Sequence, residues 1–237
     1  MPEPAPIDYA AFDALTFDCY GTLIDWEAGL LSAFRPILAA RGLTVDDDAL
    51  LERYAAYEAA AEAGPYRRYR EVLGHGLVGV LGELGATPDP AEVAAFGGSV
   101  VDWPAFPDSH DALEALRRRF RLGVLTNCDD DLFAASNRRL GVDVDWVVTA
   151  QQVGSYKPAE ANFAALFERV DVPRERILHV AQSLYHDHVP AQRLGMTSVW
   201  IDRRRGREGA GATPVAEVTP DASFPDMASF AAAATAT

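Results

Sequence analysis

The stretch LTFDCYGTLIDWEAG, residues 15–29, joins an apolar run to a carboxylate and a sharp turn. The run ends at Asp18, and Gly21 and Thr22 follow within four residues. An acid directly after a buried strand, followed by a glycine turn, raises the hypothesis of a nucleophile in an anion-binding turn. The residue two places after Asp18 indicates which chemistry such a nucleophile serves, and here it is Tyr20.

Five apolar runs rich in β-branched residues predict the strands of a sheet. They are ALTFD, RLGVLTN, WVVTA, ILHVAQ and TSVWID, ending at residues 18, 127, 150, 182 and 202. Stretches with helical periodicity separate them, such as DALEALRRRF before the second run and AEANFAALFERV before the fourth. Because alternating strands and helices specify a mostly parallel sheet covered on both faces, we expect an α/β fold with a Rossmann-like, doubly wound core.

Residues 26–104 follow a different pattern, with helical periodicity rich in Ala, Glu and Arg and no convincing strand. We expect this segment to be a helical cap domain inserted after the first strand. The Rossmann-like core would then comprise residues 10–25 and 105–237.

The composition indicates a globular protein with an acidic surface. Its 237 residues carry a net charge of −14, and 49% of them are hydrophobic. A negative field repels phosphates, so we expect no nucleic-acid or membrane partner, and any anionic small-molecule substrate must be bound by local groups. The two cysteines form no disulfide framework, and the N-terminus lacks a secretion signal, which favours a cytoplasmic protein. A homodimer is one option for the oligomeric state.

Polar side chains follow each of the first four predicted strands. In an open parallel sheet the carboxyl ends of the strands form the ligand-binding edge, so these side chains should meet there. The residues are Asp18, Thr22, Thr126, Asn127, Lys157, Gln182, Ser183 and Asp187.

With these motifs the sequence resembles the haloacid dehalogenase superfamily. DCYGT matches the nucleophile loop of that superfamily, LTN its second motif, YKP its lysine motif and VAQSLYHDHVPA its acidic fourth motif. The resemblance implies a Rossmann-like core and an aspartate nucleophile at Asp18.

The common magnesium phosphatases of this superfamily have a second aspartate two residues after the nucleophile and a metal-binding acid at the start of the fourth motif. This chain has Tyr20 and Gln182 at those positions. Neither side chain supplies the hard carboxylate oxygen that magnesium selects, and the proton donor for a phosphoryl leaving group is lost. The sequence is instead similar to the 2-haloacid dehalogenases, which implies attack on carbon with no metal or other cofactor.

The dehalogenase resemblance implies roles for further residues. Thr22 would hold the Asp18 carboxylate, and Lys157 with Asp187 would keep it ionised and oriented. Thr126 and the amides of Cys19 and Tyr20 would bind the substrate carboxylate. The remaining expected contacts with substrate or halide come from Asn127, the cap residue Arg53, Gln182, Ser183 and His186, with Arg35, Arg41 or Arg67 as alternatives to Arg53.

Some positions depart from the dehalogenase pattern. Phe163 replaces a tyrosine, Gln182 and Leu184 replace a serine and an asparagine, and His186 stands where an aromatic residue is usual. These changes leave the nucleophile intact but alter the expected halide pocket.

The sequence therefore predicts hydrolysis of short 2-haloalkanoic acids to 2-hydroxy acids through an aspartyl ester. Two alternatives remain open at this point. One is a phosphatase with a degraded magnesium site, and the other is a non-catalytic protein that binds a small anion or a protein.

Overall fold

The computed structural model describes residues 7–207 and 211–236, and its centre is a six-stranded parallel sheet. The strand order is β3-β2-β1-β4-β5-β6. The strands are β1 (Ala14–Phe17), β2 (Arg121–Thr126), β3 (Trp146–Thr149), β4 (Ile177–Ala181), β5 (Thr197–Ile201) and β6 (Ala222–Phe224). The five strands expected from the apolar runs are all present, and the α/β class is confirmed.

Strand β1 occupies the middle of the sheet and is buried along its whole length. Its last residue, Phe17, pairs with Val124 of β2 and with Val180 of β4. The carboxyl ends of these three strands therefore lie side by side. This register brings the segments after β1, β2 and β4 to one place.

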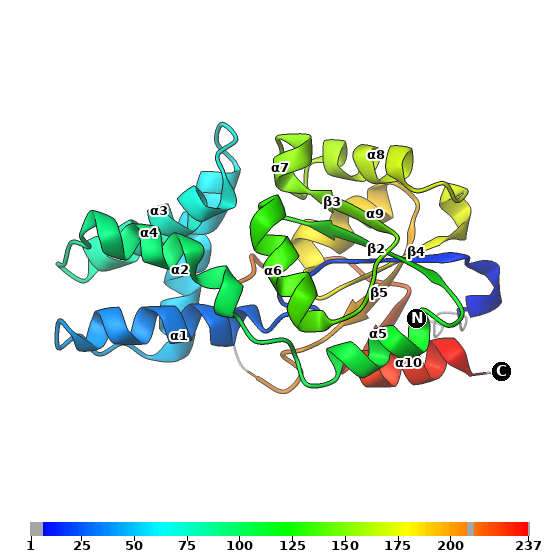
Figure 1. Cartoon of the computed structure of the whole chain (residues 1–237), viewed down its shortest axis with the longest axis horizontal. Helices are drawn as coiled ribbons and strands as arrows, with labels where there is room; N and C mark the ends of the chain where they lie inside the picture. Colours follow the sequence, from blue (N-terminus) through cyan, green and yellow to red (C-terminus); the bar gives the residue numbers. More distant parts are fainter. Residues whose placement is uncertain (1–6, 208–210, 237) are drawn as a thin grey trace.

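Helices cover both faces of the sheet (Figure 1). One face packs against α5 (Ser109–Leu116), α6 (Asp130–Leu140) and α10 (Met227–Thr235), with Leu15, Phe17 and Val124 pointing to that side. The other face packs against α8 (Glu160–Arg169) and α9 (Val189–Arg193), where Ala14 and Leu125 join a second apolar cluster. A short helix, α7 (Ala150–Val153), follows β3. The alternation of neighbouring β1 residues between two clusters is the period of two expected for a sheet buried on both sides.

The segment between β1 and β2 contributes four helices that lie beside the sheet (Figure 1). They are α1 (Trp26–Ala39), α2 (Asp47–Glu62), α3 (Tyr69–Glu83) and α4 (Pro90–Gly98), and the short 3₁₀ helix η2 (Ser99–Asp102) follows. We call α1 to α4 the cap helices. The rings of Phe34, Tyr54 and Phe96 pack together between them. The division into a core of residues 10–25 and 105–237 and a cap of residues 26–104 stays a prediction.

None of the helices in residues 7–207 and 211–236 is both long and apolar enough to cross a membrane.

The contact between α3 and α4 depends on a glycine. A Cβ on Gly97 would lie 2.5 Å from the backbone oxygen of Arg70, which cannot move aside as a side chain can. We predict that Gly97→Ala lowers the free energy of unfolding by about 1–3 kcal/mol through overpacking.

The neighbouring Gly98 is a matched control, because a Cβ there meets no described atom within 4 Å. Gly98→Ala should leave the stability within about 1 kcal/mol of the parent, the range of helix propensity. Urea unfolding of both variants checks this. Equal stabilities of the two variants would contradict the close packing of α3 on α4.

Candidate active site

The loop after β1 orients the carboxylate of Asp18. The amide of Leu23 donates to the carbonyl of Cys19 at 2.8 Å, which closes a tight turn. Gly21 adopts φ +90° in this turn, and a Cβ there would lie 3.1 Å from Oε1 of Gln182. Only glycine adopts this conformation without strain. The turn brings the hydroxyl of Thr22 back to donate to Asp18 Oδ2 at 2.8 Å, as expected from the sequence.

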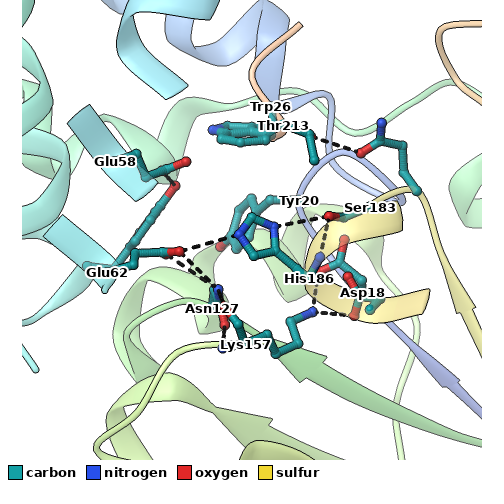
Figure 2. Close-up of a pocket in the computed structure, with 13 residues that line it drawn as sticks. Asp18, Tyr20, Trp26, Glu58, Glu62, Asn127, Lys157, Ser183, His186 and Thr213 are labelled. Carbon is teal, nitrogen blue, oxygen red and sulfur yellow. Dashed lines mark hydrogen bonds and ion pairs between the residues drawn. The ribbon is translucent and has the colours of Figure 1, made fainter. Parts of the chain in front are cut away.

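Lys157 joins the loops that follow different strands. Its side chain is 1% exposed, and Nζ donates to Asp18 Oδ1 at 2.8 Å (Figure 2). It also donates to Asp187 Oδ1 at 2.7 Å and to the carbonyl of Leu125 at 2.9 Å. It is also the single lysine in the 237-residue sequence. Burial opposes its charge, but Asp18 and Asp187 outweigh burial and raise the pKa of Lys157 above its usual value.

Asp187 lies in a short π-helix, η4 (Leu184–His188), and is fully buried. Its Oδ1 also contacts Nε2 of His179 at 2.9 Å, and Nδ1 of that ring contacts the hydroxyl of Thr16 at 2.9 Å. Burial disfavours the charged form, but Lys157 and His179 overcome it and hold the pKa of Asp187 below its usual value. Its Oδ2 is buried and has no hydrogen-bond partner among the described residues.

The Asp18 carboxyl group experiences the same opposing effects with a different balance. Burial raises the pKa of Asp18, the charge of Lys157 lowers it and Asp187 raises it, and the net result is a pKa above the usual value for an aspartate. The hydrogen bonds from Lys157 and Thr22 favour the ionised form. An ionised carboxylate held by two donors is a suitable nucleophile for an electrophilic carbon.

A cavity of about 400 Å³ empty volume, partly open to solvent, lies over Asp18 (Figure 2). Most of the expected site residues meet there. Those that line it are Asp18, Tyr20, Asn127, Lys157, Gln182, Ser183, His186 and Asp187. Cys19 and Thr126 are buried nearby but are not part of the lining, so their proposed contacts with a substrate carboxylate stay predictions.

The structure corrects the expectation for Arg53. Its guanidinium pairs with Glu83 at 3.1 Å and its side chain is 41% exposed, so it does not face the cavity. Arg53 lies on the outer face of α2, because the inner face carries Leu51, Tyr54 and Ala55. The three alternatives to Arg53 do not line the cavity either. They are Arg35, Arg41 and Arg67, and none of them is among the described lining residues.

Two glutamates of α2 occupy the cap side of the cavity instead. Glu58 is 4% exposed, and the Glu62 side chain is 7% exposed. They lie one helical turn apart and continue the buried stripe of Leu51 and Tyr54 along the helix. Sequence reasoning missed both, although that stripe is the signal that could have found them.

His179 was missed as well, although a histidine inside the apolar run ILHVAQ is a detectable signal. His186 lines the cavity as expected, with Nδ1 3.0 Å from the hydroxyl of Ser183. Burial lowers the pKa of His186 to about 4, so the ring is neutral at pH 7. It therefore contributes no positive charge to the cavity near neutral pH.

The residues at this site do not fit a magnesium ion. The hydroxyl of Tyr20 lies 2.9 Å from that of Ser136 and 3.3 Å from Sγ of Cys128. The Lys157 ammonium contacts one oxygen of Asp18 and one of Asp187. Among the described residues, no group of three or more His, Cys, Asp or Glu side chains could hold a metal ion.

The family model of the haloacid dehalogenase-like hydrolases matches residues 12–185. The chain belongs to the haloacid dehalogenase-like hydrolases. It is 22% identical to an (S)-2-haloacid dehalogenase of Pseudomonas putida, over 87% of this chain and 93% of the relative. It is also 27% identical to the 5-amino-6-(5-phospho-D-ribitylamino)uracil phosphatase of Escherichia coli K12, over 81% of this chain and 84% of the relative.

The fold of this hydrolase is shared with solved dehalogenase structures. A defluorinating L-2-haloacid dehalogenase superposes with a TM-score of 0.79 at 22% identity, covering 95% of this chain and 96% of the other. At this identity the similarity establishes the common fold. The relatives include both dehalogenases and phosphatases, so the chemistry has to be argued from the site.

The single lysine allows a direct test of the Lys157 contacts. In protein labelled with ¹⁵N-lysine, one Nζ signal should stay in the ammonium form at pH values where a free lysine, with a pKa near 10.4, loses its proton. In Asp187→Asn, burial should outweigh the remaining attraction and the pKa should fall. A signal that titrates like free lysine in the parent protein would contradict the double contact.

Proposed function

We propose that this hydrolase removes halide from short 2-haloalkanoic acids, forms a 2-hydroxy acid and needs no metal. The observation that carries the proposal is the Lys157 bridge between Asp18 and Asp187. It supplies positive charge beside the nucleophile. The side chain of Tyr20 also supports the proposal. Burial raises the pKa of its hydroxyl well above the usual value, which makes it a poor acid for protonating an oxygen leaving group.

In the first step an oxygen of Asp18 attacks the carbon that bears the halogen. A carbon–oxygen bond forms, the carbon–halogen bond breaks, and halide leaves with the bonding electron pair. Halide is a weak base, so this step needs no proton donor. Thr22 and Lys157 hold the carboxylate in one orientation, which gives the effective concentration that displacement requires.

In the second step water hydrolyses the aspartyl ester. Water attacks the carbonyl carbon of the ester, and the hydroxy acid leaves with the oxygen that Asp18 donated. The free Oδ2 of Asp187 is suited to accept a hydrogen bond from that water, while Oδ1 stays bound to Lys157 and His179. The two steps together convert a 2-haloalkanoic acid and water into a 2-hydroxy acid, a halide ion and a proton.

The competing function is hydrolysis of a phosphate ester, which the Escherichia coli relative catalyses according to its name. That reaction would need a proton for the leaving oxygen and a metal beside the nucleophile. Tyr20 and Gln182 occupy the positions from which the resemblance expects those groups. The chemistry of these two side chains favours carbon over phosphorus as the atom attacked.

We predict that halide release from a panel of 2-chloro- and 2-bromoalkanoic acids persists in excess EDTA. Ion chromatography of the released halide measures it, and p-nitrophenyl phosphate with added magnesium serves as the comparison. Halide release that EDTA abolishes and magnesium restores, or magnesium-dependent phosphate release without halide release, would overturn the proposal.

A further inference from the structure

The cap side of the cavity is acidic. Glu58 and Glu62 both line it, and they lie across it from Asp18 (Figure 2). Asp187 also belongs to the lining. Among the described lining residues Lys157 is the only lysine or arginine, and its charge is already opposed by the two aspartates. In the described lining, carboxyl groups therefore outnumber ammonium groups by four to one.

Two tyrosine hydroxyls hold the carboxyl group of Glu58 in place as a hydrogen-bond acceptor. Its Oε1 accepts from the hydroxyl of Tyr54 at 2.8 Å and from that of Tyr69 at 2.9 Å. Its other oxygen has no hydrogen-bond partner among the described residues. A buried carboxylate with a free oxygen is costly unless a donor reaches it, and donors with positive charge do so best.

Glu62 is only loosely held. Nδ2 of Asn127 lies 3.4 Å from each of its oxygens, and Nε2 of His186 lies 3.5 Å from Oε2. These distances are longer than those of strong hydrogen bonds. The carboxyl group therefore keeps most of its capacity for a closer donor.

Aromatic rings complete this side of the cavity. Tyr20, Trp26 and Tyr69 line it, and Figure 2 shows the Trp26 indole across from Glu58. Trp26 is 7% exposed. Its Nε1 is a buried donor beside the cavity and has no hydrogen-bond partner among the described residues. Aromatic faces together with carboxylates form the environment that attracts ammonium groups.

We propose that the cap side of the cavity binds a positively charged nitrogen of the substrate, held by Glu58 and Glu62 against the aromatic rings. The unpartnered N–H of Trp26 would donate to an oxygen of the same molecule. Resting on the proposed function, the substrate class is a halogenated acid that also carries an amino group, rather than a plain haloalkanoate.

The affinity for a cation should depend on pH. Burial raises the pKa of Glu58 to about 7, and burial together with Glu58 raises the pKa of Glu62. Both are protonated at low pH and become charged as pH rises, so a cation binds more tightly at higher pH and releases protons. The other charged or titratable groups that line this cavity are Asp18, Lys157, Asp187, His186, Tyr20 and Tyr69.

Unreactive probes of equal chain length test the proposal by calorimetry. They are n-butylammonium, n-butanol and butanoate, titrated into the full protein. We expect butylammonium to bind about tenfold more tightly than either of the others at pH 8, the equivalent of about 1.4 kcal/mol. Its affinity should fall between pH 8 and pH 6. Titrations in buffers of different ionisation enthalpy should show proton release.

Matched variants assign the effect to residues. Glu62→Gln and Glu58→Gln should each lose most of the preference for butylammonium, while Glu83→Gln, which changes an exposed glutamate near the same helix, should keep it. Circular dichroism checks folding, and the pH dependence of the parent protein tests the proposal even where one variant does not fold. Equal affinity for the three probes, tighter binding of butanoate or an unchanged preference in both Gln variants would overturn it.

Halide release and cation binding, measured together, distinguish failure of this inference from failure of the proposed function. Halide release from plain haloalkanoic acids with no preference for amino-substituted ones would overturn the inference alone. Preferential binding of butylammonium with no halide release from any compound would support the cation site and overturn the dehalogenase proposal.

Discussion

The bridge from Lys157 to Asp18 and Asp187 is the interaction on which the rest of the site depends. Two carboxylates this deeply buried would repel each other and take up protons without a cation between them. Lys157 favours the charged form of both, and it connects loops that follow β1, β3 and β4. Removing it would leave two buried like charges, so the ammonium supports the local fold as well as the chemistry.

The parallel sheet was predictable because its strands are buried on both faces and read as continuous apolar runs. The core half of the site was predictable for a related reason. Asp18, Lys157 and Asp187 follow strands whose ends must meet at one edge, so their closeness follows from topology.

The cap half of the site could not be predicted in the same way. Which face of a cap helix looks into the cavity depends on how that helix packs, and both faces of α2 carry charged residues. Arg53 was assigned to the site by resemblance to the dehalogenases, but it lies on the face that meets Glu83. Glu58 lies on the inner face because it shares the stripe of Tyr54, and its carboxylate is tolerated there because two tyrosine hydroxyls donate to it.

The central claim is that Asp18 forms a covalent ester, and a single turnover in H₂¹⁸O tests it most directly. The enzyme is used in excess over a substrate from which it releases halide. The peptide that contains Asp18 should gain one ¹⁸O from water, and the hydroxy acid should carry no ¹⁸O. The exposed carboxylate of Asp13, which pairs with Arg176, should stay unlabelled as a control. Label in the product with none on Asp18 would mean that water attacks the substrate carbon directly, and the account would be wrong.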